Sequence, residues 1–384
     1  MDLTRPVAES PGAYLRSAQP DAPVFFFAPR IVQQNARSFQ RGFAGLVSYA
    51  VKANPDPMVL ENLLAAGISA FDVASPSEFR GVRNLAPGAT LHYHNPVRSR
   101  HEIAAALECG ITSFSVDRPQ ELAKLAALAQ GRILETSIRL ALPVSGGAYH
   151  FGDKFGAPPD LAVELLQGAA TFGFTPSMTF HPGTQCTDPA AWDTYINACA
   201  RIARRAGIRL ARLNVGGGFP SHRGLDAPEL PPIFAGISAA VARAFRGHEP
   251  ALICEPGRAM VAEAFTLATR VKAIGEDGSV FLNDGIYGGL AELPSIGTQA
   301  RITAISSAGS AIPGPATPRR VFGPTCDSLD VLPEKINLPN AIAEDDYVLF
   351  AGNGAYSTAL STRFNGYGNH AVVTLMPKMT QTCA

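Results

Sequence analysis

Four features able to do chemistry stand directly after short β-prone runs in the sequence. Lys52 lies near the end of the run VSYAVKA, and the proline that follows shortly after it cannot continue a strand. His181 follows PSMTF, Glu255 follows ALIC, and three successive glycines follow RLNV. Each has an ordinary explanation by itself: a solvated lysine, a packed histidine, a tight turn, or an ion pair between Glu255 and Arg258. Gathered in one cleft, they would form a reaction centre.

The glycine run, Gly216–Gly218, is the signal with the most direct physical explanation. Three residues without side chains let backbone N–H groups surround an anion. Gly257 and Arg258 of the next motif, EPGR, could complete the same nest. Since GxxxxGK[ST] does not occur, the loop is not of the nucleoside-triphosphate type. The pattern predicts a phosphate site, with a glycine-rich packing turn as the alternative.

A phosphate site together with a lysine suggests pyridoxal 5′-phosphate (PLP). Neutral lysine forms a Schiff base with an aldehyde, and burial favours the neutral amine. The pyridine ring withdraws electrons while its nitrogen stays protonated, and a carboxylate such as Glu255 can hold that proton. The imidazole of His181 could stack on the ring.

Eight β-prone runs alternate with helical segments between residues 47 and 258. Connecting segments such as PSEFRGVRNLA have the apolar spacing of amphipathic helices. Eight such units in series predict an α/β fold with a (β/α)8 TIM-like barrel, and a doubly wound sheet is the alternative. The runs are VSYAVKA (47–53), ISAFDVAS (68–75), ATLHYHNP (89–96), ITSFSVD (111–117), TSIRLALP (136–143), PSMTFHPG (176–183), RLNVGGGF (212–219) and ALICEPGR (251–258).

Active sites of such barrels lie at the carboxyl ends of the strands. Besides the residues named above, the predicted strand ends carry Asp72, His94 with Asn95, Asp117 and Arg139. The two aspartates also suit helix N-caps. The pattern therefore places a lysine, a histidine, a glycine run and a glutamate at one cleft.

A second domain is predicted where the alternation of β-prone and helical segments stops. After Arg258, β-prone runs are separated by Gly, Pro, Asn and Asp, with little helical spacing. We expect a barrel over residues 27–262 and a mainly antiparallel C-terminal β domain formed by residues 1–26 with 263–384. The Pro-rich stretch 306–320 is expected to be a surface loop.

Composition narrows the classes of partner. The 384 residues include 32 basic and 32 acidic side chains, so no net field attracts nucleic acid or an anionic membrane. We find no signal peptide and no run long enough to span a bilayer. The six cysteines lack CxxC or CxxH pairs, so neither a metal site nor a disulfide framework is predicted. We expect a cytoplasmic protein.

Nine motifs, in order from about residue 49 to 367, resemble those of the fold-type III PLP-dependent decarboxylases. This family contains the ornithine, lysine, arginine and diaminopimelate decarboxylases. The motifs are YAVKAN, FDVASPSE, SVD, HPGTQ, VGGGFP, EPGR, NDGIYGG, GPTCDSLD and GNGAYSTALSTRFNGY. The resemblance implies a PLP-binding barrel, a C-terminal β domain and a homodimer whose active sites are shared between subunits.

The resemblance also assigns roles to residues. Lys52 resembles the Schiff-base lysine, His181 the histidine that stacks on the ring, and Glu255 the partner of the pyridine nitrogen. Cys326 resembles the cysteine that protonates the α-carbon after CO2 leaves. The other implied cofactor-binding residues are Asp72, Arg139, Thr184, Gly216, Gly217, Gly218, Gly257, Arg258 and Tyr356. The implied substrate-binding residues are Asp327, Tyr287, Glu292 and Cys326 itself, and Cys326 and Asp327 would come from the partner subunit.

The implied reaction is α-decarboxylation of a basic amino acid. Lys52 exchanges its Schiff base for one with the substrate, the carbanion left by CO2 delocalises into the pyridinium ring as a quinonoid, and Cys326 returns a proton. The pair Cys326–Asp327 favours the ornithine/lysine branch, because diaminopimelate decarboxylases usually carry Cys-Glu there. Ornithine, giving putrescine for polyamine biosynthesis, is the first expectation. Lysine, diaminopimelate and a specialised diamino acid are alternatives.

Several positions depart from the family pattern. The motif H-V-G-S-Q is replaced by HPGTQ, in which Pro182 removes an N–H while Thr184 keeps a hydroxyl. HYHNP and the insert PVSGGAYH could line the substrate pocket. In LAELPSIG no second aspartate is present, and Glu292 either replaces it or has a structural role.

Two other functions compete with a decarboxylase. An amino-acid racemase of the alanine racemase type would place an arginine, not Glu255, against the pyridine nitrogen. An inactive regulatory homologue that binds a partner protein would not need Lys52, His181 and Cys326 together.

Overall fold

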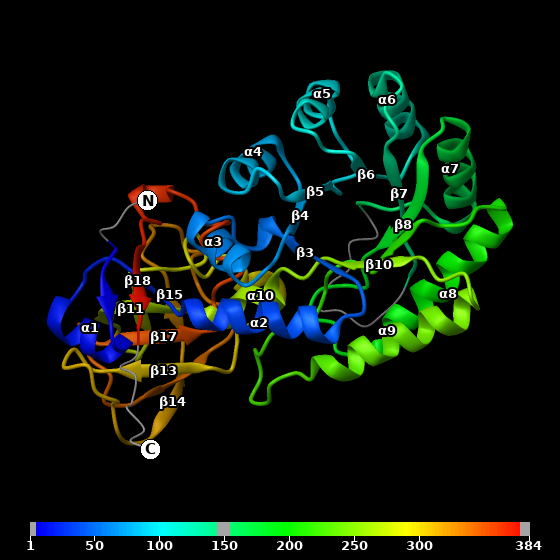
Figure 1. Cartoon of the computed structure of the whole chain (residues 1–384). Coiled ribbons are helices and arrows are strands. Elements are labelled where there is room, and N and C mark those ends of the chain that lie inside the picture. Colours follow the sequence, from blue (N-terminus) through cyan, green and yellow to red (C-terminus); the bar gives the residue numbers. More distant parts are fainter. Residues whose placement is uncertain (1–4, 144–153, 377–384) are drawn as a thin grey trace, which may run out of the picture. The chain divides into compact units, whose positions relative to one another are not determined.

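The computed structural model describes residues 5–143 and 154–376, which form two compact units (Figure 1). One unit comprises residues 33–220 and 228–260, and the other comprises the described residues of 1–32, 221–227 and 261–384. Most of the predicted insert PVSGGAYH lies outside the described residues.

The first unit is a closed barrel of eight parallel strands, as expected. Each strand pairs with its sequence neighbour, and β10 closes the ring against β3. The strands are β3 (Leu46–Ala50), β4 (Ala70–Val73), β5 (Thr90–Tyr93), β6 (Ser113–Val116), β7 (Glu135–Leu140), β8 (Thr175–Phe180), β9 (Arg212–Asn214) and β10 (Ala251–Cys254).

Helices follow the barrel strands and surround them (Figure 1). Many begin at a proline, whose fixed φ suits the first helical position, and several have a Ser or Asp N-cap before it. The helices are α2 (Pro29–Gly42), α3 (Pro57–Ala65), α4 (Pro76–Leu85), α5 (Arg100–Glu108), α6 (Pro119–Ala129), α7 (Pro159–Thr171), α8 (Pro189–Ala206), α9 (Leu230–Phe245) and α10 (Arg258–Val261).

The barrel interior is unusually polar. Ser48, His92, Ser113 and Ser177 are buried on its strands. They are hydrogen-bonded: the Ser48 hydroxyl lies 2.9 Å from His92 Nδ1, and Ser177 donates to the Glu135 carboxylate at 2.8 Å. Hydrogen bonds of this kind offset the cost of burying polar groups, although His92 Nε2 has no partner among the described residues.

The second unit, called the β unit below, is mainly an antiparallel sheet, as predicted. The central strand β11 pairs antiparallel with β2, β12 and β17, and β13 pairs with β17. Its strands are β1 (Val7–Ala8), β2 (Val24–Phe27), β11 (Phe265–Ile274), β12 (Val280–Leu282), β13 (Ile302–Ile305), β14 (Ala316–Arg319), β15 (Val321–Phe322), β16 (Ile336–Pro339), β17 (Tyr347–Ala351) and β18 (Ala371–Leu375); its helices are α1 (Pro11–Ala18) and α11 (Leu293–Ile296).

One local prediction was partly wrong. The stretch 306–320 is mostly exposed, but β14 forms within it and pairs antiparallel with β16. Its prolines are tolerated because β14 and β16 make a two-stranded ribbon, in which each strand has an unpaired edge.

Candidate active site

Lys52 lies just beyond the end of a barrel strand. The expected run 47–53 ends as a strand at Ala50, and a single 3₁₀ turn, Val51–Ala53, carries the lysine. Its Nζ donates to Asp72 Oδ2 at 2.7 Å. Burial and repulsion from Glu255 raise the pKa of Asp72, although the Lys52 ammonium opposes them. The amine is therefore held at the strand ends by a carboxylate on the adjacent strand.

Glu255, directly after β10, is the centre of a charged cluster. His94 Nδ1 and Asn214 Nδ2 both bind Oε1, the amide at 2.5 Å. Burial disfavours ionisation of Glu255, but the charge and hydrogen bond of His94, together with Lys52 and Asn214, hold its pKa well below the usual range. One polar atom each from Asp72, His94 and Glu255 lie within 4.8 Å of one another. Glu255 is thus an anion, which a partner of a pyridinium nitrogen must be.

His181 is a neutral imidazole at the end of β8. Burial, with the nearby charges of Arg139 and Lys52, lowers its pKa to about 3. Its Nδ1 accepts the Gly183 N–H at 3.1 Å, so the ring proton lies on Nε2. Arg139, on β7, lies 5.1 Å from the ring centre of Phe155, and burial lowers its pKa. The neutral imidazole of His181 can stack on an aromatic cofactor.

The glycine run forms a cradle that side chains would fill. Gly216 and Gly218 have φ of +71° and +83°, and a Cβ on either would lie 2.1 Å from a backbone oxygen. A Cβ on Gly217 would lie 2.7 Å from the Glu255 backbone oxygen and 3.4 Å from His181 Nε2, and one on Gly257 would lie 2.8 Å from Ala53 Cβ. Only glycine fits these positions. Thr184 and Arg258, the other residues predicted to hold the phosphate from this unit, are both buried, and Arg258 begins α10.

Three residues of this region were not assigned a role from sequence. Asn214 Oδ1 accepts the Gly216 N–H at 2.9 Å, and this bond links Glu255 to the glycine run. Glu78, in the first turn of α4, accepts the Ala74 N–H at 2.7 Å, and burial raises its pKa. His94 was predicted at a strand end, in the motif HYHNP that could line the substrate pocket, but no contact with Glu255 was predicted. The signal for Asn214 was its place two residues before Gly216, because alternate residues of a strand share one face.

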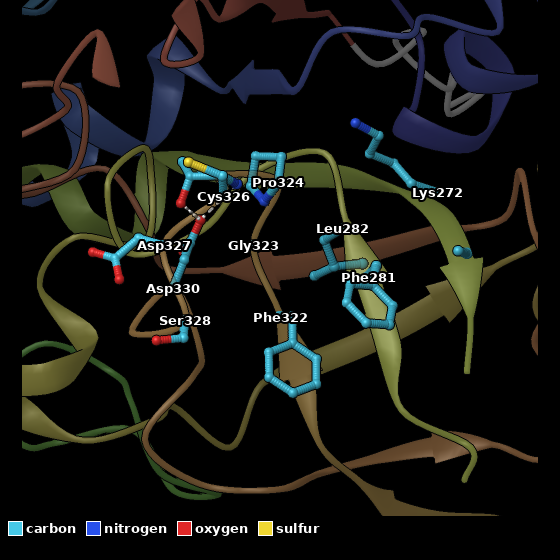
Figure 2. A pocket seen from close by; sticks show the side chains of 12 residues that line it. Lys272, Phe281, Leu282, Phe322, Gly323, Pro324, Cys326, Asp327, Ser328 and Asp330 are labelled. Carbon is cyan, nitrogen blue, oxygen red and sulfur yellow. Dashed lines mark hydrogen bonds between the residues drawn. The ribbon is translucent and has the colours of Figure 1, made fainter. Parts of the chain in front are cut away.

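The predicted proton donor, Cys326, is exposed on a loop of the β unit. The loop folds around the buried carboxylate of Asp330, as Figure 2 shows. Asp330 Oδ2 accepts the Thr325 N–H at 3.0 Å and its hydroxyl at 2.7 Å, and Oδ1 accepts the Ile286 N–H at 3.0 Å. The Cys326 N–H donates to Asn365 Oδ1 at 3.0 Å. The thiol is therefore presented by a fixed loop beside a hollow that also contains the stacked rings of Phe281 and Phe322.

The predicted substrate contacts lie in the same unit. The Tyr287 hydroxyl donates to Asp327 Oδ2, and this hydrogen bond lowers the pKa of Asp327. Glu292 immediately precedes α11, and Tyr356 has φ of +52°. Lys52, His181 and Glu255 belong to the barrel unit, whereas Cys326, Asp327, Tyr287, Glu292 and Tyr356 belong to the β unit.

Known proteins identify the class to which this fold and site belong. Residues 30–262 match the family model "Pyridoxal-dependent decarboxylase, pyridoxal binding domain". The chain belongs to this family and is a PLP-dependent amino-acid decarboxylase. The cradle, the neutral His181 and the anionic Glu255 fit the phosphate, ring and nitrogen of PLP.

Three known decarboxylases show how similar this chain is to members of the class. A lysine/ornithine decarboxylase of Selenomonas ruminantium is 32% identical over 84% of this chain and 81% of its own length. The decarboxylase flvG of Aspergillus flavus is 32% identical over 83% of this chain and 77% of its own. The solved arginine decarboxylase of Paramecium bursaria Chlorella virus matches with a TM-score of 0.83 at 25% identity, covering 94% of this chain and 98% of that one. No helix in the described part of the chain is both long and apolar enough to cross a bilayer.

Proposed function

We propose that the chain decarboxylates a basic diamino acid, with ornithine, giving putrescine, as the first candidate and lysine as the second. The observation that carries this substrate class is Asp327, an anion directly beside Cys326 and oriented by the Tyr287 hydroxyl. A carboxylate in the residue next to the proposed proton donor suits the distal ammonium group of a diamino acid substrate. The names of the relatives, which include lysine/ornithine and ornithine decarboxylases, support the same class.

We propose that the barrel domain comprises residues 27–262 and that each side chain of its site has one role. Bound PLP supplies an aldehyde for Lys52 and an electron-withdrawing ring. Asp72 holds the lysine in place, His181 covers one ring face, and Glu255 holds the proton of the pyridine nitrogen. The phosphate would be held by Thr184, Gly216, Gly217, Gly218, Gly257 and Arg258, and Arg139 would contact the cofactor; Tyr356, a residue of the β unit, is a further proposed phosphate ligand.

We also propose that the active protein is a homodimer in which Cys326 and Asp327 act in the partner's site. Apolar side chains are exposed at the Cys326 loop: Leu329 on the loop is 68% exposed, and Phe364, next to the Asn365 that accepts the Cys326 N–H, is 42% exposed. Exposed apolar groups gathered around a reactive thiol are typical of an interface. A cytoplasmic location agrees with the free state of the described cysteines.

Release of CO2 from ornithine, lysine, arginine, diaminopimelate and diaminobutyrate tests the substrate class. We expect turnover of the diamino acids with one distal ammonium, and turnover of diaminopimelate alone would contradict the role of Asp327. Asp327→Ala should raise KM for the best substrate about 10- to 100-fold with PLP affinity unchanged. Glu344→Ala, an exposed carboxylate of the same unit, is the matched control.

Mixing Lys52→Ala and Cys326→Ala chains tests the shared site. Each variant alone should be inactive, and the mixture should recover up to about a quarter of wild-type activity, since half of the dimers then contain one intact site. No recovery after mixed refolding would contradict shared sites.

A further inference from the structure

His94 is buried at the centre of the barrel, directly after β5, with both ring nitrogens engaged. Nδ1 bonds Glu255 Oε1 and also lies 3.0 Å from Asn214 Nδ2, and Nε2 lies 3.3 Å from the Ser113 hydroxyl. Only 6% of the residue is exposed. An imidazole with two fixed hydrogen-bond partners cannot rotate, so the Nδ1 bond to Glu255 is a defined part of the site.

The surroundings of His94 favour its charged form. Burial lowers its pKa, but the charge and hydrogen bond of Glu255, supported by Asp72 and Glu135, outweigh burial and raise it. His92 stacks on it with ring centres 5.4 Å apart, and burial lowers the pKa of His92 to about 3. The proton of this histidine pair therefore resides on His94. The charged or titratable groups around the pair are Lys52, Asp72, Glu135, Arg139, Arg212 and Glu255.

The two oxygens of Glu255 are not equivalent. Oε1 accepts from His94 and from Asn214, whereas Oε2 accepts no hydrogen bond from any residue that the structure describes. The Asn214 amide is held in turn by the Gly216 N–H. Glu255 is thus fixed through one oxygen, and the other is left for a further donor.

We propose that His94 is a positioning residue that acts through Glu255: as an imidazolium it holds Oε1, leaving Oε2 to accept the proton of the pyridine nitrogen. The inference rests on the proposed role of Glu255. A cationic donor on Oε1 also makes the carboxylate a weak base. The proton consequently stays on the pyridine nitrogen, where it strengthens the electron-withdrawing ring, and does not move to Glu255.

Holoenzyme loaded with ¹⁵N-labelled PLP provides a direct test, because the ¹⁵N chemical shift reports protonation of the pyridine nitrogen. In His94→Ala the shift should move towards that of an unprotonated pyridine. His94→Asn keeps a donor near the Nδ1 position but removes the charge, so its shift should lie between those of His94→Ala and the wild type. We expect kcat to fall about 10- to 100-fold in His94→Ala with KM within about threefold.

Two further variants separate the possible failures. Glu255→Gln should move the shift at least as far as His94→Ala, and an unchanged shift in Glu255→Gln would refute the proposed role of Glu255 itself. If the ¹⁵N shift changes in Glu255→Gln but keeps its wild-type value in His94→Asn, the role of His94 is refuted and the role of Glu255 stands. If His94→Ala does not fold, His94→Asn still decides the question. His92→Gln, at the adjacent buried histidine, should leave the shift unchanged.

Discussion

The barrel cluster and the Cys326 loop are opposite kinds of site. In the barrel, Glu255, His94 and Asp72 are almost fully enclosed, and each charge already has a partner at the end of another strand. On the β unit, Cys326 is exposed and is surrounded by exposed apolar groups such as Leu329. Burial in the barrel shifts pKa values strongly, whereas the exposed thiol has a fixed backbone but no enclosure. The barrel residues are thus enclosed by their own unit, whereas Cys326 on its loop is open to solvent.

Lys52→Ala should have the largest effect, because it removes the amine that we propose binds the cofactor's aldehyde. We expect loss of the visible absorbance band of the lysine-bound cofactor and at least an about 10³-fold fall in kcat. Lys335→Ala, an exposed lysine of the β unit, is the control. An unchanged band in Lys52→Ala would place cofactor attachment outside the barrel cluster.

Cys326→Ala should separate the two regions most clearly. The absorbance band and PLP affinity should remain, since no barrel residue changes, while kcat falls about 10²- to 10⁴-fold through loss of a proton donor. Cys109→Ala is a matched control, because Cys109 follows α5 at the end of the barrel where strands begin. Loss of PLP binding in Cys326→Ala would contradict this division.

Asp330→Asn should have an intermediate effect that is confined to the loop. One oxygen that accepts backbone N–H groups becomes an amide, so two bonds to Thr325 or the bond to Ile286 are lost. Unfolding free energy should fall by about 1–3 kcal/mol. We expect kcat to fall about tenfold through misplacement of Cys326, with PLP affinity unchanged. Calorimetry measures the unfolding free energy, steady-state kinetics measures kcat, and titration with PLP measures the affinity.

His92→Gln should change only the pH dependence of stability. The ordinary histidine pKa is 6.5, and in the folded chain the pKa of His92 is lowered to about 3. Between these values the unfolded chain binds the extra proton, so stability is present above about pH 6.5 and is lost as the pH falls towards 3. Unfolding titrations of His92→Gln should have a slope that is smaller by about 1.4 kcal/mol per pH unit in this range. An unchanged slope would mean that His92 titrates normally.

Much of the barrel site could be predicted from the sequence, because strand ends and glycine runs are local signals. The motifs with Lys52, His181 and Glu255 follow strands in the expected order, and parallel strands bring their carboxyl ends together. The 3₁₀ turn at Lys52 and strand β14 were not predicted, since local propensity does not decide where pairing stops. The use of Asn214 depends on the pairing of β9 with β10, which brings it to Glu255, 41 residues away in the sequence.

The sequence by itself determined the barrel, the β domain and the chemical types available at the strand ends. Those features depend on periodicity, on turn residues and on glycines that no other residue replaces. Only the tertiary structure decided which protonation states those residues have. His92 lies on β5 and His94 directly after it, yet one is neutral and the other is charged, because only His94 is hydrogen-bonded to Glu255. A pKa depends on partners from other strands and on burial, and neither is written in the local sequence.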